Sequence, residues 1–317
     1  MYRYTFRRAV TSVFVLFGVS VVTYLMMYLT PGDPAELVLR AQTVHDQAAV
    51  ERFREQYRLD EPVWKQYGHW LWDVLHGDFG RSYVTNRPVS AMLVDNAPST
   101  AILAVAAMAI ALAIAVPAGV VSAVHKGQVP DSVSQLGSLL GVSMPNFWLG
   151  YILILVFSIG MPVRSLGVFP VSGAGSLDRL VLPALTLGSG VAAIMTRLLR
   201  SAMLEVLEED YVRTARSKGL AERIVVYKHA FRNALVPVIT VAGIQFGYLL
   251  NGAVVVEIVF ARPGLGKLVI DALFDRDYPV IQAATLVIAA LFVGINFLVD
   301  VTYRYIDPRI DLRRGRR

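Results

Sequence analysis

The chain has 317 residues, of which 55% are hydrophobic and 17% are charged, and its formal net charge is +6. Soluble globular domains average about 25% charged residues, so this composition indicates a protein that has lipid as its solvent. The sequence contains no cysteine, which excludes disulfides, thiolate metal sites and cysteine nucleophiles.

Six uncharged stretches predict transmembrane helices, because about 20 apolar helical residues cross the ~30 Å hydrocarbon core of a bilayer. The third stretch is too long for one straight span and contains Pro145, which predicts a bend or an added external turn. The fourth is the shortest and contains Pro183, which predicts a short or broken span. We therefore predict an all-α, polytopic membrane protein with six transmembrane helices. The stretches are Ala9–Gly32, Ala97–Val124, Ser132–Val163, Leu180–Thr196, Ala234–Val256 and Tyr278–Val299.

The first stretch follows three arginines, Arg3, Arg7 and Arg8, a pattern that secretory signals share. It is longer than the roughly 7–15 residues of a signal's apolar core, and no small-residue cleavage site follows it. We interpret it as an uncleaved first span. Residues 1–32 then contain a cytoplasmic N-terminus and this span.

The distribution of charge predicts the topology, because lysine and arginine concentrate on the cytoplasmic side of membrane proteins. With six spans, both termini share one side with the 125–131 and 197–233 loops, and this side carries the basic excess. We predict that it is cytoplasmic. Residues 33–96 then form an external segment, and residues 97–317 form a five-span core with cytoplasmic loop 197–233 and cytoplasmic tail 300–317. The basic residues flank spans, so the charge requires no nucleic-acid partner.

The external segment contains three of the four tryptophans, Trp64, Trp70 and Trp72, among charged residues. We expect short helices and loops that cap the outer face. The aromatic cluster has two interpretations, a ligand contact or anchoring at the membrane interface, and anchoring is the commoner role of tryptophan there.

Spacing in two later stretches predicts close helix packing. Gly137 with Gly141 and Gly243 with Gly247 both follow the G-x-x-x-G pattern. Small residues at this spacing let helix backbones approach each other.

The sequence contains no complete phosphate-binding, metal-binding or catalytic motif. Gly266-Lys267 suggests a phosphate loop, but the pattern G-x-x-x-x-G-K-S/T requires glycine where Ala261 stands and a hydroxyl residue where Leu268 stands. The histidines have no metal-ligand spacing, and no span carries a pair of carboxylates or a Ser–His pair, as a proton pump or intramembrane protease requires. Glu257 is interpreted as an interfacial residue that faces water. We predict no catalytic site, no metal site and no cofactor in this chain, so driven transport would need energy from a partner.

One charged segment interrupts the late apolar stretches. Acidic residues precede Asp210 and basic residues follow it, an order that complements a helix dipole and predicts a helix over Asp210–Lys218. Gly219 supplies a stop. A second short helix carries an apolar stripe made of Leu220, Ile224, Val225 and Tyr227. Something must cover such a stripe, either the protein's own helix ends and lipid headgroups or a soluble partner, and composition alone leaves both open.

The segment YVRTARSKGL…HAFRNALVPVIT resembles the E-A-A-x-x-x-G loop of ABC-importer permeases, in the form of the dipeptide/oligopeptide branch. Ala215 and Gly219 take the second alanine and the glycine of the motif. Arg213 and Thr214 stand in place of its Glu and first Ala, and Arg232 stands in place of a later proline. Both departures are similar to the peptide branch. The resemblance extends over nearly the whole chain through LTPGDPAE, GDFGRSYVTNRPV, VSMPNFWLG, VVVEIVFARPGLGKL, RDYPVIQ and NFLVDVTYRYIDPRIDLR.

The resemblance implies an ABC type I importer permease fold in the inner or plasma membrane. It implies a translocation pathway formed with a second permease subunit, two cytoplasmic ATPase subunits that bind ATP and Mg, and an external substrate-binding protein. The loop would be the coupling helix that contacts an ATPase subunit. Its expected coupling residues are Arg213, Ala215, Arg216, Gly219, Leu220 and Ile224.

The implied cargo is a dipeptide or oligopeptide, and nickel or another small solute is the alternative within the same class. A self-contained channel or secondary carrier is the rival class, and it would need ionisable residues buried in mid-span, which the sequence does not show. The candidate pathway-lining residues are polar residues in the spans, although hydrogen bonding between helices is their commoner role. They are Asn146, Gln245, Asn251, Gln282 and Asn296.

Overall fold

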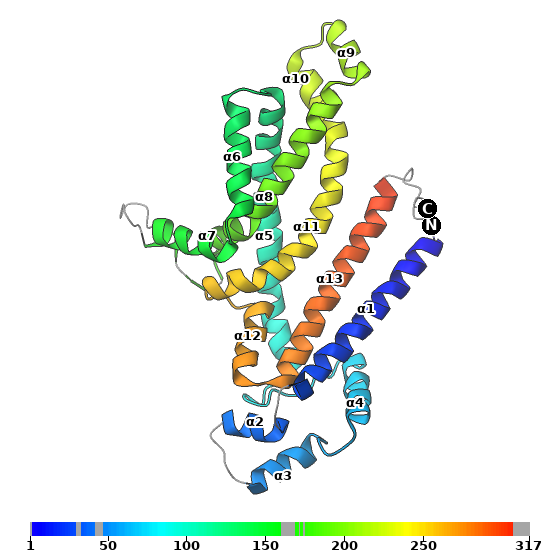
Figure 1. Ribbon diagram of the computed structural model, residues 1–317, viewed down its shortest axis with the longest axis vertical. Coiled ribbons are helices and arrows are strands. Elements are labelled where there is room, and N and C mark those ends of the chain that lie inside the picture. Colours follow the sequence, from blue (N-terminus) through cyan, green and yellow to red (C-terminus); the bar gives the residue numbers. More distant parts are fainter. Residues whose placement is uncertain are drawn as a thin grey trace. The chain divides into compact units, whose positions relative to one another are not determined.

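The computed structural model describes residues 2–29, 33–41, 47–159, 169–170, 172–173 and 175–306. Within these ranges the regular elements are helices, and one isolated antiparallel bridge joins Arg81 and Pro88 (Figure 1). Five described helices are long and apolar enough to span a membrane, and a bent pair raises the number to six. The predicted all-α polytopic fold is confirmed.

The long helices are α1 (Tyr2–Leu29), α5 (Val89–Val124), α8 (Asp178–Leu207), α11 (Phe231–Val259) and α13 (Tyr278–Ile306). The bent pair is α6 (Val129–Ser143) and α7 (Asn146–Leu153), which the π-helix η1 (Ile154–Ser158) continues. Four shorter helices are α2 (Pro34–Ala41), α3 (Gln47–Gln56), α4 (Val63–Leu75) and α12 (Leu265–Asp275). The ends of the first and third predicted stretches, at 30–32 and 160–163, and the tail from 307 onward lie outside the described residues.

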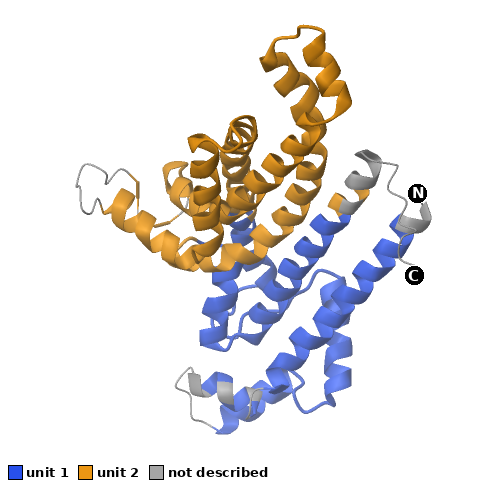
Figure 2. Ribbon diagram, turned by 45° about the horizontal axis from the view of Figure 1, so that its top comes forward, with its two compact units in different colours: residues 1–100, 263–297 blue, residues 101–262, 298–317 orange. Residues whose placement is uncertain are grey.

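The chain forms two compact units, residues 1–100 with 263–297 and residues 101–262 with 298–317 (Figure 2). In unit 1, the predicted external segment forms α2, α3, α4 and the turn that carries the 81–88 bridge. Its core includes Val38, Val89, Leu265 and Val280, each fully buried. These side chains attach the segment to α12 and the start of α13.

A buried carboxylate fixes this attachment. Asp277 precedes α13 and is 3% exposed. It accepts hydrogen bonds from the Ser82 hydroxyl and from the Tyr83 backbone N–H, the latter at 3.0 Å. Burial raises the pKa of the Asp277 carboxyl, while these hydrogen bonds oppose the shift. The 82–85 turn is therefore held against the start of α13.

In unit 2, α8 is the central helix, with buried residues along its length from Leu182 to Met203. Glycines allow close contacts between helices of this unit. A β-carbon on Gly188 would lie 2.5 Å from the Ala107 carbonyl oxygen of α5, and one on Gly141 of α6 would lie 3.0 Å from Ala193 Cβ. One on Gly243 of α11 would lie 2.5 Å from Val299 of α13. Gly141 and Gly243 pack closely as predicted, whereas Gly137 has open space around it, so the predicted close packing of the Gly137–Gly141 pair is wrong at Gly137.

The two prolines behave differently from one another. The predicted bend at Pro145 is confirmed, because α6 and the α7–η1 segment meet at 109°. Met144 is extended there, as the residue before a proline prefers. The expected break at Pro183 is wrong, since α8 runs unbroken from Asp178 to Leu207. Pro183 lies near the start of the helix, where it removes one backbone hydrogen bond and its fixed φ suits the helix.

A second difference concerns Glu257. This residue was expected to face water, but its side chain is fully buried in α11. Arg262, which is 4% exposed, lies close enough to Glu257 to interact with its charge. Burial lowers the pKa of the Arg262 guanidinium, and the negative charge of Glu257 opposes that shift. The nearby positive charge of Arg262 explains why Glu257 is buried, although the sequence alone placed this residue at the surface.

The most complete polar network of unit 2 surrounds Asp131, in the first turn of α6 and 2% exposed. Arg200 of α8 donates two hydrogen bonds to its carboxylate, at 2.7 and 2.8 Å. The Ser122 hydroxyl, the Gly127 backbone N–H and the Gln135 amide donate at 2.6, 2.8 and 2.9 Å. We call these five residues the Asp131 clamp. It joins the end of α5 and the start of α6 to α8.

The clamp generates a stability prediction. Asp131→Ala leaves the Arg200 charge without the carboxylate to which it donates two hydrogen bonds, and breaking such a pair destabilises the fold. We expect the apparent melting temperature of the purified chain, followed by tryptophan fluorescence, to fall by roughly 5–15 °C. The control is Lys126→Ala, which removes an exposed pair with Glu208 at 3.7 Å and should shift it by little. Equal melting temperatures for the two variants would contradict the importance of the clamp.

Candidate coupling site

The charged segment leaves α8 and forms three short helices in sequence. They are α9 (Asp210–Ser217), α10 (Glu222–Ile224) and the π-helix η3 (Val225–Ala230), which leads into α11. Figure 1 shows α9 and α10 projecting beyond the neighbouring ends of α5 and α6. The predicted helix over Asp210–Lys218 and the second short helix are confirmed. The segment 210–233 is called the coupling loop below.

Gly219 forms the corner between α9 and α10. Its φ is +76°, in the left-handed region that residues with a β-carbon rarely adopt. No atom lies within 4 Å of the position that a β-carbon would take there. The backbone conformation, and not a lack of space, therefore selects glycine at this corner.

An ion pair closes the same corner. Arg216 Nη2 lies 2.7 Å from Glu222 Oε1, and Arg216 Nε lies 3.2 Å from Oε2, so the guanidinium makes a two-point contact across the turn. The hydrogen bond to Glu222 raises the pKa of Arg216. Because both side chains are partly exposed, the pair contributes modestly to stability and mainly fixes the angle of the turn.

The underside of the coupling loop is apolar and closed. Val212, Ala215 and Val225 are buried together, with Val206 and Leu207 of α8 packed against them. Ala215 was expected to contact a partner, but it is only 7% exposed and packs inside this cluster. Val225 was predicted to be part of the apolar stripe, but it is buried in this cluster as well. The small side chain of Ala215 lets α9 lie against the end of α8.

The outer face of the coupling loop carries exposed side chains. Leu220, Ile224 and Tyr227 are 39%, 43% and 56% exposed, which is high for apolar residues. Arg213 is exposed as well and lies 3.6 Å from Asp210. The loop thus exposes apolar side chains together with paired basic and acidic ones.

Tyr211 attaches α9 to the start of α11. Asn233 Nδ2 donates to the Tyr211 hydroxyl oxygen at 2.6 Å and to the His229 carbonyl at 3.2 Å. Together with the Gly219 corner and the buried underside, this contact gives the coupling loop one defined shape.

Sequence reasoning missed the support beneath the coupling loop. It assigned Arg200 to a loop that begins at 197, whereas α8 continues to Leu207 and points Arg200 at Asp131. Lys126 lies 3.7 Å from Glu208 at the same end. The one available signal was Asp131 itself, a lone acid directly before a long uncharged stretch.

The candidate pathway residues are divided between the two units. In unit 2, Asn146 is half-buried and faces Gly252, Gln245 is half-buried, and Asn251 is exposed. In unit 1, Gln282 is 5% exposed and lines a cavity, while Asn296 donates to the Phe292 carbonyl of its own helix at 2.8 Å. Their role in the pathway therefore stays a prediction.

Comparison with known proteins bears on the whole chain. Two family models match it: "Binding-protein-dependent transport system inner membrane component" over residues 115–312, and the N-terminal model of the same systems over residues 1–104. Glutathione transport system permease protein GsiC of Escherichia coli is 43% identical over 310 residues, which cover 98% of this chain and 99% of that protein. The protein of the same name from Shigella boydii is 42% identical over equal coverage.

Solved structures support the fold. An inward-facing conformation of the MetNI methionine ABC transporter matches with a TM-score of 0.56 at 20% identity, covering 68% of this chain and 96% of that chain. An amino acid ABC transporter crystallised with histidines matches with a TM-score of 0.53 at 12% identity, covering 68% and 94%. The helix order, the loop and the family matches together show that this chain belongs to the inner-membrane permease components of binding-protein-dependent ABC importers.

Proposed function

We propose that this permease carries dipeptides or short oligopeptides, that it forms the pathway with a second permease subunit, and that the coupling loop docks on a cytoplasmic ATPase subunit. The observation that carries the proposal is the coupling loop, which combines a fixed backbone with exposed apolar and charged side chains. A loop that transmits motion must keep its shape under load. The Gly219 corner, the Arg216–Glu222 pair and the buried underside provide that stiffness.

The choice of cargo rests on similarity. The curated relatives are named as glutathione permeases, and glutathione is a peptide-type solute. Their identity of 43% extends over nearly the full chain, which supports a peptide-type cargo here. Competition between a labelled dipeptide and nickel for uptake separates this proposal from its alternative within the class.

The ATPase subunits are proposed as the energy source. In this chain, Gly264 is extended, and Gly266-Lys267 lies in the first turn of α12, where Lys267 pairs with Asp271. This arrangement is an ordinary helix start and leaves the lysine side chain engaged.

The purified chain should therefore bind no ATP. We expect a fluorescent ATP analogue with Mg²⁺ to show no saturable binding to the chain alone, and saturable binding once ATPase subunits are added. Nucleotide binding that persists after removal of all ATPase subunits would contradict the proposed division of labour.

The proposed topology places the coupling loop and both termini in the cytoplasm and residues 33–96 outside. The Lys126–Glu208 and Arg200–Asp131 contacts support part of it, because they bring the 125–131 turn to the same end of unit 2 as the coupling loop.

Single cysteines test the topology, since the natural chain has none. Ser201→Cys and Val84→Cys both place the thiol at an exposed position. We expect an impermeant maleimide to label the Val84 variant on intact cells and the Ser201 variant only after permeabilisation. The reverse pattern would contradict the orientation.

Coupling is tested at Gly219. Any β-carbon there costs about 1 kcal/mol of backbone strain, and a large side chain would also obstruct docking. We expect Gly219→Trp to insert and fold, but to lose peptide uptake and co-purification of the ATPase subunits. Gly219→Ala carries the strain without the bulk and should lose less.

The matched control is Gly77→Trp. Gly77 also has positive φ, +84°, and open space around it, but it follows α4 in the predicted external segment. The Gly77→Trp variant should still co-purify with the ATPase subunits. If Gly219→Trp transports normally and retains them, the coupling loop does not have the proposed role.

A further inference from the structure

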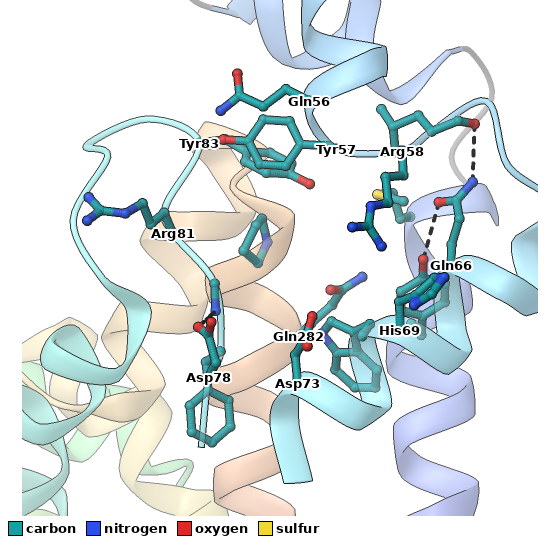
Figure 3. Close-up of a pocket in the computed structure, with 17 residues that line it drawn as sticks. Gln56, Tyr57, Arg58, Gln66, His69, Asp73, Asp78, Arg81, Tyr83 and Gln282 are labelled. Atoms are coloured by element: carbon teal, nitrogen blue, oxygen red, sulfur yellow. Dashed lines mark hydrogen bonds between the residues drawn. The ribbon is translucent and has the colours of Figure 1, made fainter. Parts of the chain in front are cut away.

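Unit 1 contains a cavity of about 370 Å³, and all of its described lining residues belong to that unit. α1, the turn after α3, α4, the 78–83 segment and the start of α13 form its walls (Figure 3). Small-molecule sites commonly occupy about 300–1,000 Å³. The volume therefore suits a ligand of a few residues' size.

Opposite charges line this cavity without neutralising each other. The side chains of Arg58 and Asp73 are both exposed to solvent, and they make no hydrogen bond or ion pair with any described residue. Figure 3 shows the Arg58 guanidinium pointing into the cavity, with Asp73 and Gln282 across from it. Arg81 instead points away and donates to the Asn86 carbonyl at 2.8 Å. Among the described lining residues, Arg58 thus offers a cation and Asp73 an anion, while the second carboxylate, Asp78, accepts the Gly80 backbone N–H at 2.9 Å.

Gln282 adds a second, independent signal. It is 5% exposed, yet among the described residues its amide has no hydrogen-bond partner. Its remaining exposure is to the cavity that it lines. Amides of largely buried residues usually find partners within the protein, but the atoms of this one are not fully enclosed and stay accessible. The amide of Gln282 therefore offers both a donor and an acceptor to whatever enters the cavity.

One wall of the cavity is held by Gln66, whose own amide is saturated. It donates to the Leu59 and Glu61 carbonyls at 3.1 and 2.7 Å, and it accepts from the hydroxyls of Tyr24 and Tyr28. These bonds attach the turn after α3 to α1 and α4. Arg58 lies in this turn with a φ of 54°, an unusual value for a non-glycine residue that the surrounding bonds maintain.

Another wall is aromatic and equally fixed. Tyr83 donates its backbone N–H to Asp277 at 3.0 Å, and its ring lies 4.4 Å from that of Tyr57, centroid to centroid. Burial raises the pKa of both phenols, so they stay neutral. Trp70 also lines the cavity, whereas Trp64 and Trp72 are 70% and 65% exposed. The site is therefore preformed and does not depend on ligand to assemble.

We propose that this cavity binds a small zwitterion that carries both a carboxylate and an ammonium group, as a short peptide does. Arg58 receives the carboxylate, Asp73 receives the ammonium, and Gln282 hydrogen-bonds the peptide group between them. Arginine and carboxylate form the stronger type of charge-assisted bond, and the rings of Tyr57 and Trp70 can cover the ligand's apolar atoms. This site lies in unit 1 and includes Gln282, one of the candidate pathway residues.

A lipid phosphoethanolamine headgroup shares the paired charges, and the experiment separates the two sources. The full-length chain is purified in an uncharged detergent, and binding of trialanine is measured by titration calorimetry and by tryptophan fluorescence. N-acetyl-trialanine and trialanine amide each lack one charge. Glycerophosphoethanolamine supplies the headgroup chemistry without the peptide.

We expect trialanine to bind, and each blocked peptide to bind about tenfold more weakly or worse. Arg58→Gln and Asp73→Asn should each weaken binding by a similar factor while keeping the melting temperature. The matched control is Arg87→Gln, whose guanidinium pairs with Asp95 outside the cavity and which should bind normally. Trp70→Phe should abolish the fluorescence change, and Trp64→Phe should preserve it.

Several outcomes would overturn the proposal. They are the absence of trialanine binding, equal binding of the blocked peptides, normal binding by folded Arg58→Gln and Asp73→Asn variants, and tighter binding of glycerophosphoethanolamine than of trialanine. The measurement needs neither ATPase subunits nor external binding protein. Its result is therefore independent of whether the assembled importer carries peptides, which uptake assays decide separately.

Discussion

The burial of the Asp131 charge is the constraint on which the coupling end of unit 2 depends. A carboxylate that is 2% exposed requires donors, and here they come from the end of α5, the following turn, α6 and α8. All of them can bond only when the three helix ends meet in one arrangement. α8 then continues directly into the coupling loop. A charge that is costly to bury thus fixes the base from which the loop projects.

The coupling loop itself uses weaker and more local interactions. A positive φ at Gly219, an ion pair between Arg216 and Glu222, and a small apolar cluster each set a different part of its shape. None of these would hold an isolated peptide of this length in one conformation. Because α8 and α11 anchor the loop at both ends, these interactions need to exclude only a few alternative loop conformations. The shape of the loop is set without Leu220, Ile224 and Tyr227, whose side chains remain exposed.

The sequence allowed prediction of the features that depend on composition and local backbone chemistry. Run length located the long helices, Pro145 marked the bend, and Gly219 marked the corner. Features that depend on a distant partner were not predictable. Glu257 has its opposite charge in Arg262, and the orientation of Ala215 follows from the end of α8, neither of which a helical period or a charge count encodes. The unit 1 cavity could not be predicted from the sequence for the same reason, because its lining residues are spread along the chain between positions 24 and 282.

The distribution of satisfied and unsatisfied polar groups separates support from recognition in this chain. Asp131, Gln66 and Asp277 are buried and fully engaged, and each lies beneath a functional candidate as part of its framework. Arg58, Asp73 and Gln282 line the cavity without a partner among the described residues, the first two exposed to solvent and Gln282 largely buried. Native proteins rarely leave a buried amide without a partner, because the loss is not recovered elsewhere. The contrast within unit 1, where Gln66 is saturated and Gln282 is not, is best explained by a bonding partner that comes from outside the chain.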